Sequence, residues 1–228
     1  YRIDLNVRSI THFSHDPNKH ESLSANRIQS ILCDSEKRLW VGTLQGLDFF
    51  ERETNHFIHC DNRSVNVLFE DHNRCIWVGT NSGLFRMNAE KFHLETFPGD
   101  EILFNNRSLD IYSIIEDRAQ NLWVSTRTSG LFVVDASREQ VVHFTESDSV
   151  KQSINTNMVR ALFEDSRGNV WIGTRSGGLN YFNPETKEFN FYGTEDGLPS
   201  ELILGIREDR KGNLWIGTHN GISKFNPA

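Results

Sequence analysis

The chain has 228 residues, 37 % hydrophobic and 24 % charged, which is the usual balance of a globular protein. Its formal net charge of −7 disfavours a nucleic-acid partner, because such proteins carry a basic face. No apolar run approaches the roughly 20 residues that a membrane-spanning helix needs. The chain begins at Tyr1 and shows no signal peptide, so we expect a mature chain or a piece of a longer one.

The first predicted element is a β-strand at residues 7–13, and a motif recurs five times after it. Each copy has a tryptophan, an aspartate six residues earlier, a threonine three residues later, and then a Gly–apolar pair. Because five such coincidences keep a fixed spacing, they identify an internal repeat. The tryptophans are Trp40, Trp77, Trp123, Trp171 and Trp215, and the aspartates are Asp34, Asp71, Asp117, Asp165 and Asp209.

Each repeat predicts short strands. A β-rich segment such as 159–163 comes first, then a turn such as 165–169, whose Asp, Gly and Asn suit a tight hairpin, and then the tryptophan strand. A third strand begins at the Gly–apolar pair, and a weaker fourth is predicted at 57–60, 92–97, 141–144 and 189–192. Strands in this order, repeated about every 40–50 residues, predict an all-β fold, a β-propeller of five four-stranded blades.

We expect one propeller domain over residues 1–228, with repeat units at about 14–60, 61–97, 98–144, 145–192, and 193–228 plus 1–13. The last unit ends after its third strand, so residues 7–13 would supply the missing strand and close the ring. Closure would pair two edges that otherwise stay open. The strand count also fits part of a larger, seven-bladed propeller, and this alternative stays open.

The recurring residues are predicted to be scaffold. The tryptophan strands are apolar on both faces, which suits a sheet packed between two others. Glycines two residues after the tryptophan, such as Gly42 and Gly173, leave room for a neighbour's side chain. Tryptophans could stack on sugars, and acidic pairs could catalyse, but recurrence in nearly every blade favours core packing and turn stabilisation. The pairs are Glu70-Asp71, Glu116-Asp117, Glu164-Asp165 and Glu208-Asp209.

The three cysteines, Cys33, Cys60 and Cys75, lack the Cys-x-x-Cys spacing of a zinc site. We expect small, buried apolar side chains, with one pair open to oxidation, no metal and no cofactor. An odd count leaves at least one thiol unpaired within the chain, and the redox compartment stays open.

The segments GNVWIGT (168–174) and GNLWIGT (212–218), with the preceding EDSRG and EDRKG, resemble two-component regulator propeller repeats. The run DGLPS (196–200) and the loops SLSAN (22–26) and SINTN (153–157) resemble that family too, so the resemblance covers nearly the whole chain. It implies the periplasmic sensor region of a bacterial hybrid two-component system histidine kinase, in a membrane-anchored, dimeric parent protein. Such regions commonly sense glycans or their breakdown products.

The chain departs from the family's usual plan, which has seven blades, often in two sets, followed by a β-sandwich, a membrane helix and a kinase. We therefore expect that five units by themselves do not carry out signalling. The family's motif residues are structural, so the resemblance supplies no catalytic residue.

Candidate ligand-binding residues lie at two blade positions that vary from repeat to repeat. One lies five residues before each Asp, and the other directly follows each motif Thr. Strand one enters and strand two leaves at the same end of a blade, so both sets should face one mouth of the channel, where binding residues concentrate. Solvated loop residues with local ion pairs are the alternative. The candidates are Tyr112, Arg127, Arg160, Arg175, His219 and Asn81.

The resemblance, together with these residues, implies a non-enzymatic sensor module that recognises an oligosaccharide or another small ligand. Arginines attract carboxylate or sulfate groups, and Tyr112 could stack on a sugar ring. A propeller lyase or hydrolase is an alternative, although the candidate set contains no carboxylate pair. A protein-interaction scaffold is another, since the fold suits it equally well.

Overall fold

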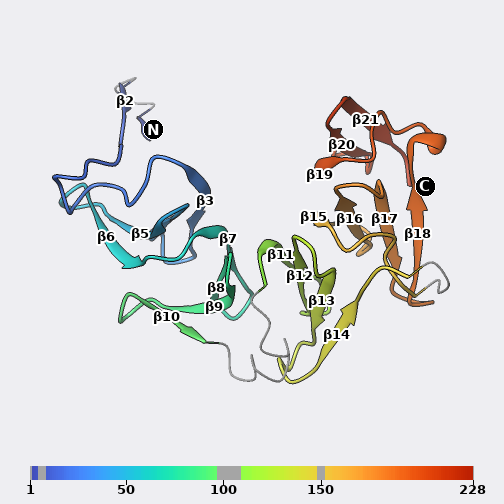
Figure 1. Ribbon diagram of the computed structural model, residues 1–228, viewed down its shortest axis with the longest axis horizontal. Helices are drawn as coiled ribbons and strands as arrows, with labels where there is room; N and C mark the ends of the chain where they lie inside the picture. Colours follow the sequence, from blue (N-terminus) through green and yellow to red (C-terminus); the bar gives the residue numbers. More distant parts are fainter. Residues whose placement is uncertain (1, 5–8, 97–108, 148–151, 228) are drawn as a thin grey trace. The chain divides into compact units, whose positions relative to one another are not determined.

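The structure is a computed structural model that describes residues 2–4, 9–96, 109–147 and 152–227 (Figure 1). These residues form antiparallel strands and one short 3-10 helix, η1 (Thr194–Asp196), with no α-helix among them. Over these ranges no helix is long and apolar enough to cross a membrane. The predicted all-β propeller fold is confirmed.

Two compact units make up the chain, and each is described by itself. The first contains β1–β10, except that Ser82–Leu84 belongs with the second unit. It holds a two-stranded ribbon and two four-stranded sheets in sequence order, β3-β4-β5-β6 and β7-β8-β9-β10. The strands are β1 (Arg2–Asp4), β2 (Ser9–Thr11), β3 (Ile28–Cys33), β4 (Leu39–Thr43), β5 (Gly46–Glu51), β6 (His56–Asp61), β7 (Val65–Glu70), β8 (Ile76–Thr80), β9 (Gly83–Asn88) and β10 (His93–Thr96).

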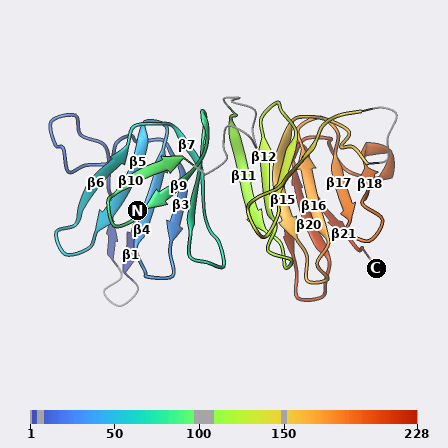
Figure 2. The ribbon, with the colours of Figure 1, turned by 90° about the horizontal axis from the view of Figure 1, so that it is seen from below.

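The second unit contains β11–β21 in three sheets, β11-β12-β13-β14, β15-β16-β17-β18 and β19-β20-β21. Figure 2 shows these sheets stacked face to face, with β15 packed between β11 and β19. The strands are β11 (Ile111–Glu116), β12 (Leu122–Thr126), β13 (Leu131–Val134), β14 (Val141–Phe144), β15 (Val159–Glu164), β16 (Val170–Thr174), β17 (Leu179–Asn183), β18 (Glu188–Tyr192), β19 (Ile203–Glu208), β20 (Leu214–Thr218) and β21 (Gly221–Phe225).

Each motif aspartate ties its hairpin to the motif tryptophan. Asp165 Oδ1 accepts the backbone N–H groups of Arg167 and Asn169, both at 2.9 Å, and its Oδ2 accepts Trp171 Nε1 at 2.8 Å. The same Trp-to-Asp bond occurs in all five sheets, from 2.7 to 3.1 Å. Burial would raise the pKa of Asp165, but the hydrogen bonds from Trp171 and Asn169 hold it below its usual value. Turn stabilisation by the acidic pairs is confirmed.

In three of the acidic pairs the glutamate links its sheet to the sheet before it, whereas Glu116 pairs with Arg138 of its own sheet at 2.6 Å. Glu208 accepts the backbone N–H of Ser166 at 2.7 Å and its hydroxyl at 2.6 Å. Glu70 binds Ser35 in the same way, at 2.7 Å for both bonds. Both residues of the acidic pair are therefore committed to the scaffold.

Small residues let neighbouring sheets approach closely, as expected. A Cβ added to Gly42 would lie 2.6 Å from Val65 Cγ1, and one added to Gly173 would lie 2.5 Å from Ile203 Cγ2. A larger side chain at either glycine would therefore push the next sheet away.

Four of the five tryptophans are buried, and the fifth corrects the prediction. Trp40, Trp77, Trp123 and Trp171 are at most 3 % exposed, whereas Trp215 is 39 % exposed. Trp171 packs against the following sheet, including Phe225 at 5.5 Å between ring centroids. Within the second unit no described sheet covers the corresponding face of β19–β21, so Trp215 meets solvent.

The expected ring closure by residues 7–13 stays a prediction. Residues 7 and 8 lie outside the described ranges, and β2 (Ser9–Thr11) pairs with β1 (Arg2–Asp4) in the first unit; in the second unit, the Trp215 sheet has three described strands. Phe13, just after β2, packs edge-on against Phe50 and Phe57 at 5.2 and 5.5 Å. A short ribbon costs little loop entropy, and burial of the Phe13 ring ties the following segment to the first sheet.

Candidate functional site

A β-bulge marks the first of the two variable positions in every sheet. The pairing of strand one with strand two shifts register once, and each shift skips one residue near the start of strand one. A bulge bends the strand and re-aims a side chain. The skipped residues are those of the first variable set, Gln29, Asn66, Tyr112, Arg160 and Leu204.

The second variable set lies at the same end of each sheet. The residue after the motif threonine donates its backbone N–H to the backbone carbonyl of the residue that directly precedes strand one. Arg127 binds Asp110 and Arg175 binds Met158, both at 2.9 Å, and His219 binds Leu202 at 3.0 Å. Strand direction therefore places both sets together within each sheet.

Four of the sequence-predicted residues meet in the second unit. Tyr112, Arg127, Arg160 and Arg175 line one small hollow, together with Met158 and Val159. We call it the arginine hollow. Its volume is about 20 Å³, so it encloses little more than a water molecule, and a larger ligand would rest on its rim.

The charges of the arginine hollow are only partly neutralised. Arg127 Nη1 lies 3.3 Å from Asp110 Oδ2, and Arg160 Cζ lies 6.0 Å from the centroid of the Tyr112 ring. Within the described ranges no carboxylate pairs with Arg160 or Arg175. Two guanidinium groups are thus available to a carboxylate, sulfate or hydroxyl group of a ligand.

The remaining two candidates do not line the arginine hollow. His219 is exposed and occupies the same position in the neighbouring sheet, at the end of β20. Asn81 is exposed at the corresponding end of its own sheet in the first unit, where its N–H binds the Ser64 carbonyl at 3.1 Å. The structure therefore groups four of the six.

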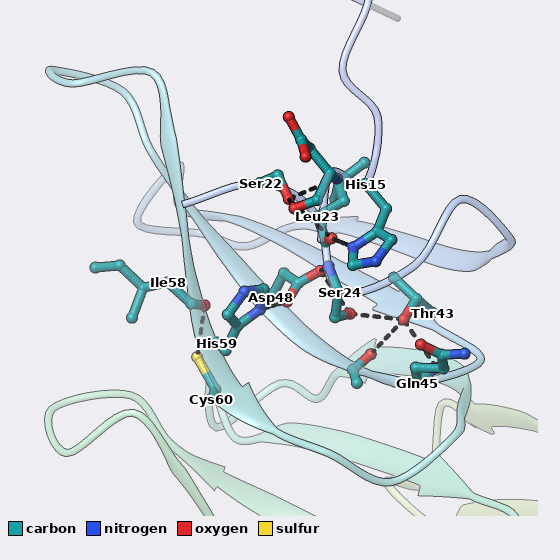
Figure 3. Close-up of polar contacts among 12 residues, drawn as sticks. His15, Ser22, Leu23, Ser24, Thr43, Gln45, Asp48, Ile58, His59 and Cys60 are labelled. Carbon is teal, nitrogen blue, oxygen red and sulfur yellow. Dashed lines mark hydrogen bonds and ion pairs between the residues drawn. The ribbon is translucent and has the colours of Figure 1, made fainter. Parts of the chain in front are cut away.

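A buried carboxylate in the first unit was missed by the sequence argument. Asp48, on β5, is fully buried; its Oδ1 lies 2.6 Å from His59 Nδ1 on β6 (Figure 3). Its Oδ2 accepts both the N–H and the hydroxyl of Ser24 at 2.8 Å, and that hydroxyl also lies 2.8 Å from Thr43 Oγ1. The available signal was that Asp48 stands where other repeats have Phe85, Phe132, Asn180 and Ser223.

This cluster holds a loop in place and does not activate Ser24 as a nucleophile. Ser24 and His59 bind opposite oxygens of Asp48, so the serine hydroxyl is held by the carboxylate and not by an imidazole that would activate it. The cluster ties the segment before β3 to strands β5 and β6. The role of Asp48 is thus structural.

No disulfide joins the three cysteines, all of which lie in the described ranges. Cys33 is exposed, while Cys60 and Cys75 are half-buried, so the expected full burial does not occur. Burial, with the nearby Asp48 carboxylate, raises the pKa of Cys60 to about 12. A thiol with this pKa is a poor nucleophile at neutral pH. Among the described side chains, no three His, Cys, Asp or Glu residues gather closely enough to hold a metal ion.

Comparison with known proteins shows the family to which the chain belongs. The sequence matches the family described as two component regulator propeller in five segments, which together make up about half of the chain. The chain therefore belongs to the two-component regulator propeller family. The matched segments are 22–45, 61–82, 107–128, 153–176 and 197–220.

A curated relative is histidine kinase P4 of Formosa agariphila, 35 % identical over 82 residues, which are 34 % of this chain and 6 % of the relative. The extracellular domain of a putative hybrid two component system from B. thetaiotaomicron superposes with a TM-score of 0.71 at 20 % identity, covering 100 % of this chain and 38 % of that one. Virginiamycin B lyase from Staphylococcus aureus superposes at 0.67 with 12 % identity, covering 98 % and 75 %. At these identities the structures show a shared propeller fold.

Proposed function

We propose that this propeller is the ligand-binding part of a two-component sensor and that it recognises a carbohydrate without chemically changing it. The observation that carries the proposal is the arginine hollow, where Tyr112 and three arginines converge from two sheets. Guanidinium groups bind carboxylates and sulfates through paired hydrogen bonds, and an aromatic ring beside them offers a face to a sugar. The ligand is therefore an oligosaccharide that carries acidic groups.

The setting of this site is part of the same proposal. The relatives include a histidine kinase and the extracellular domain of a putative hybrid two component system, which support an extracellular or periplasmic position. We further propose that the parent protein is membrane-anchored and dimeric. The five sheets form one propeller domain, or part of a seven-bladed one. His219, at the matching end of the neighbouring sheet, extends the binding surface beside the arginine hollow, and Asn81 is a candidate ligand contact at the matching end of its own sheet in the first unit.

A lyase is the second candidate, because virginiamycin B lyase shares the fold. General acid–base chemistry requires a positioned acid and base. The side chains that line the arginine hollow supply three guanidinium groups and a phenol. Asp110, the nearby carboxylate, is occupied by Arg127. The lining therefore supports binding better than turnover.

The test is calorimetric titration with an oligogalacturonate and with a neutral galacto-oligosaccharide of the same length. We expect saturable binding of the acidic sugar and a loss of at least tenfold in affinity for Arg160→Ala and for Arg175→Ala. Arg160→Lys should also weaken binding, because an ammonium group lacks the planar fork.

Arg167→Ala is the matched control, since Arg167 is an exposed arginine in the Asp165 hairpin, away from the arginine hollow. Equal affinity in all variants, or preference for the neutral sugar, would reject the assignment. Release of an unsaturated or shortened sugar, detected by mass spectrometry, would favour the lyase or hydrolase.

A further inference from the structure

A second and much larger hollow lies between the sheets β11–β14 and β15–β18 of the second unit. Its volume is about 680 Å³, within the range of about 300–1,000 Å³ that small-molecule pockets occupy. It lies along the β11–β12 and β15–β16 hairpins, at Asn121 and Gly168, and so at the other end of these strands from the arginine hollow. We call it the interblade groove.

The third sheet lacks an aromatic ring that the first and fourth sheets place beside the motif tryptophan, as does the fifth sheet, where Lys224 stands at this position. The residue paired with the motif tryptophan is Phe49 in the first sheet and Tyr181 in the fourth. These rings lie 5.1 Å from Trp40 and 4.9 Å from Trp171, centroid to centroid. The corresponding partner of Trp123 is Val133. A valine leaves the volume of a ring unfilled.

The groove also leaves an apolar side chain in water. Val133 pairs across the sheet with Val142, which is 53 % exposed. Exposed aliphatic side chains that line a hollow are typical of binding sites. The apolar lining includes Trp123, Val133, Val142, Phe144, Val170 and Phe182.

The carboxylates that line the groove, and the Arg118 guanidinium, are already engaged within the protein. Asp117 accepts Trp123 Nε1 at 2.7 Å, Asp135 accepts the Gln140 backbone N–H at 2.8 Å, and Glu164 accepts the Arg118 backbone N–H at 2.9 Å. The Arg118 guanidinium donates to the Ser166 carbonyl at 2.7 Å. With three engaged carboxylates and two basic side chains, Arg118 and Lys187, the groove has no large excess charge to pair with a ligand.

Two polar groups remain available. The side-chain amides of Gln140 and Gln152 line the groove, and neither has a hydrogen-bond partner within the described ranges. An amide both donates and accepts, so it suits a hydroxyl or carbonyl group of an uncharged molecule.

We infer that the interblade groove binds a small, uncharged ring compound, aromatic or alicyclic. Its ring occupies the space above Val133 and Val142, where Phe49 and Tyr181 place theirs in the first and fourth sheets, and a hydroxyl or carbonyl group meets Gln140 or Gln152. This site is separate from the arginine hollow and takes a ligand of different chemistry, so either proposal can fail alone.

The test uses 2-naphthol as the probe, with methyl NMR of the whole chain as the site-specific readout. We expect saturable shifts of the Val142 and Val170 methyls, while Ile31 and Ile222, exposed elsewhere on the protein, stay unchanged. Val133→Tyr copies Tyr181 and fills the groove, so it should weaken binding at least tenfold without lowering the thermal midpoint.

Val133→Ile, which keeps an aliphatic side chain, is the matched control, and its affinity for 2-naphthol should be within about threefold of that of the unsubstituted protein. Val142→Gln, at an exposed position, supplies a second variant that should weaken binding even if Val133→Tyr folds poorly. Absence of saturable shifts, or unchanged affinity in Val133→Tyr and Val142→Gln, would overturn the assignment. Tighter binding of 2-naphthoate than of 2-naphthol would overturn the uncharged ligand class.

Discussion

The unequal burial of two motif tryptophans predicts unequal costs for the same substitution. Trp171 is 2 % exposed and Trp215 is 39 % exposed, although each donates Nε1 to its own aspartate, at 2.8 and 3.1 Å. Both belong to the second unit, so both substitutions act on the same packed sheets. Trp171→Ala and Trp215→Ala thus form a matched pair within one molecule.

The expected magnitudes follow from buried area. A tryptophan buries about 200 Å², worth about 5 kcal/mol at about 25 cal/mol per Å², which agrees with the roughly 3–5 kcal/mol measured for Trp→Ala in cores. About two-fifths of the Trp215 side chain already meets water, so its loss should cost about 3 kcal/mol or less. We expect Trp171→Ala to be the more destabilising by about 2 kcal/mol.

Urea unfolding followed by far-UV circular dichroism measures both losses without relying on tryptophan fluorescence. Trp171→Phe is the conservative companion, because it keeps a ring and removes only the N–H, for an expected loss of about 1–2 kcal/mol. Equal losses for the two alanine variants, or a loss below about 1 kcal/mol for Trp171→Ala, would refute the burial argument.

Two further predictions concern buried carboxylates. The pKa of Asp165 is lowered below 3.8 in the folded protein. The carboxylate therefore stabilises the fold fully above that pH, and this stabilisation is lost as the pH falls through the folded-state pKa. Asp165→Asn should weaken the dependence of the unfolding free energy on pH, measured from pH 6 to 2. A parallel pH dependence in both proteins would contradict this. Ser24→Ala removes one hydrogen bond to Asp48 and should destabilise the first unit by about 1–2 kcal/mol. Hydrogen exchange at the backbone amides of residues 22–26 should become faster. Unchanged exchange would show that Ser24 does not hold this loop in place.

The repeat architecture was predictable because its determinants are local. The Asp–Trp bond spans six residues, and strands one and two meet through a tight hairpin, so spacing in the chain alone identifies them. The shared end of the two variable sets was predictable for the same reason, since it depends only on strand direction within a sheet. Tyr112, Arg160 and their counterparts could thus be grouped before any coordinates.

Contacts between sheets, and contacts made by the chain's first residues, could be identified only from the tertiary structure. The repeat at Trp215 is as regular as the others, yet its exposure depends on whether another sheet packs over it. The pairing of β2 with β1, and the buried Ser24–Asp48–His59 cluster, arise between segments whose approach no repeat spacing records. Val133 is visible in the sequence as a departure from Phe49 and Tyr181, but the hollow it leaves depends on the distance between two packed sheets. Hydrogen bonds inside a repeat follow from the residues of that repeat, whereas the burial of a side chain and the empty volume beside it depend on how neighbouring sheets pack.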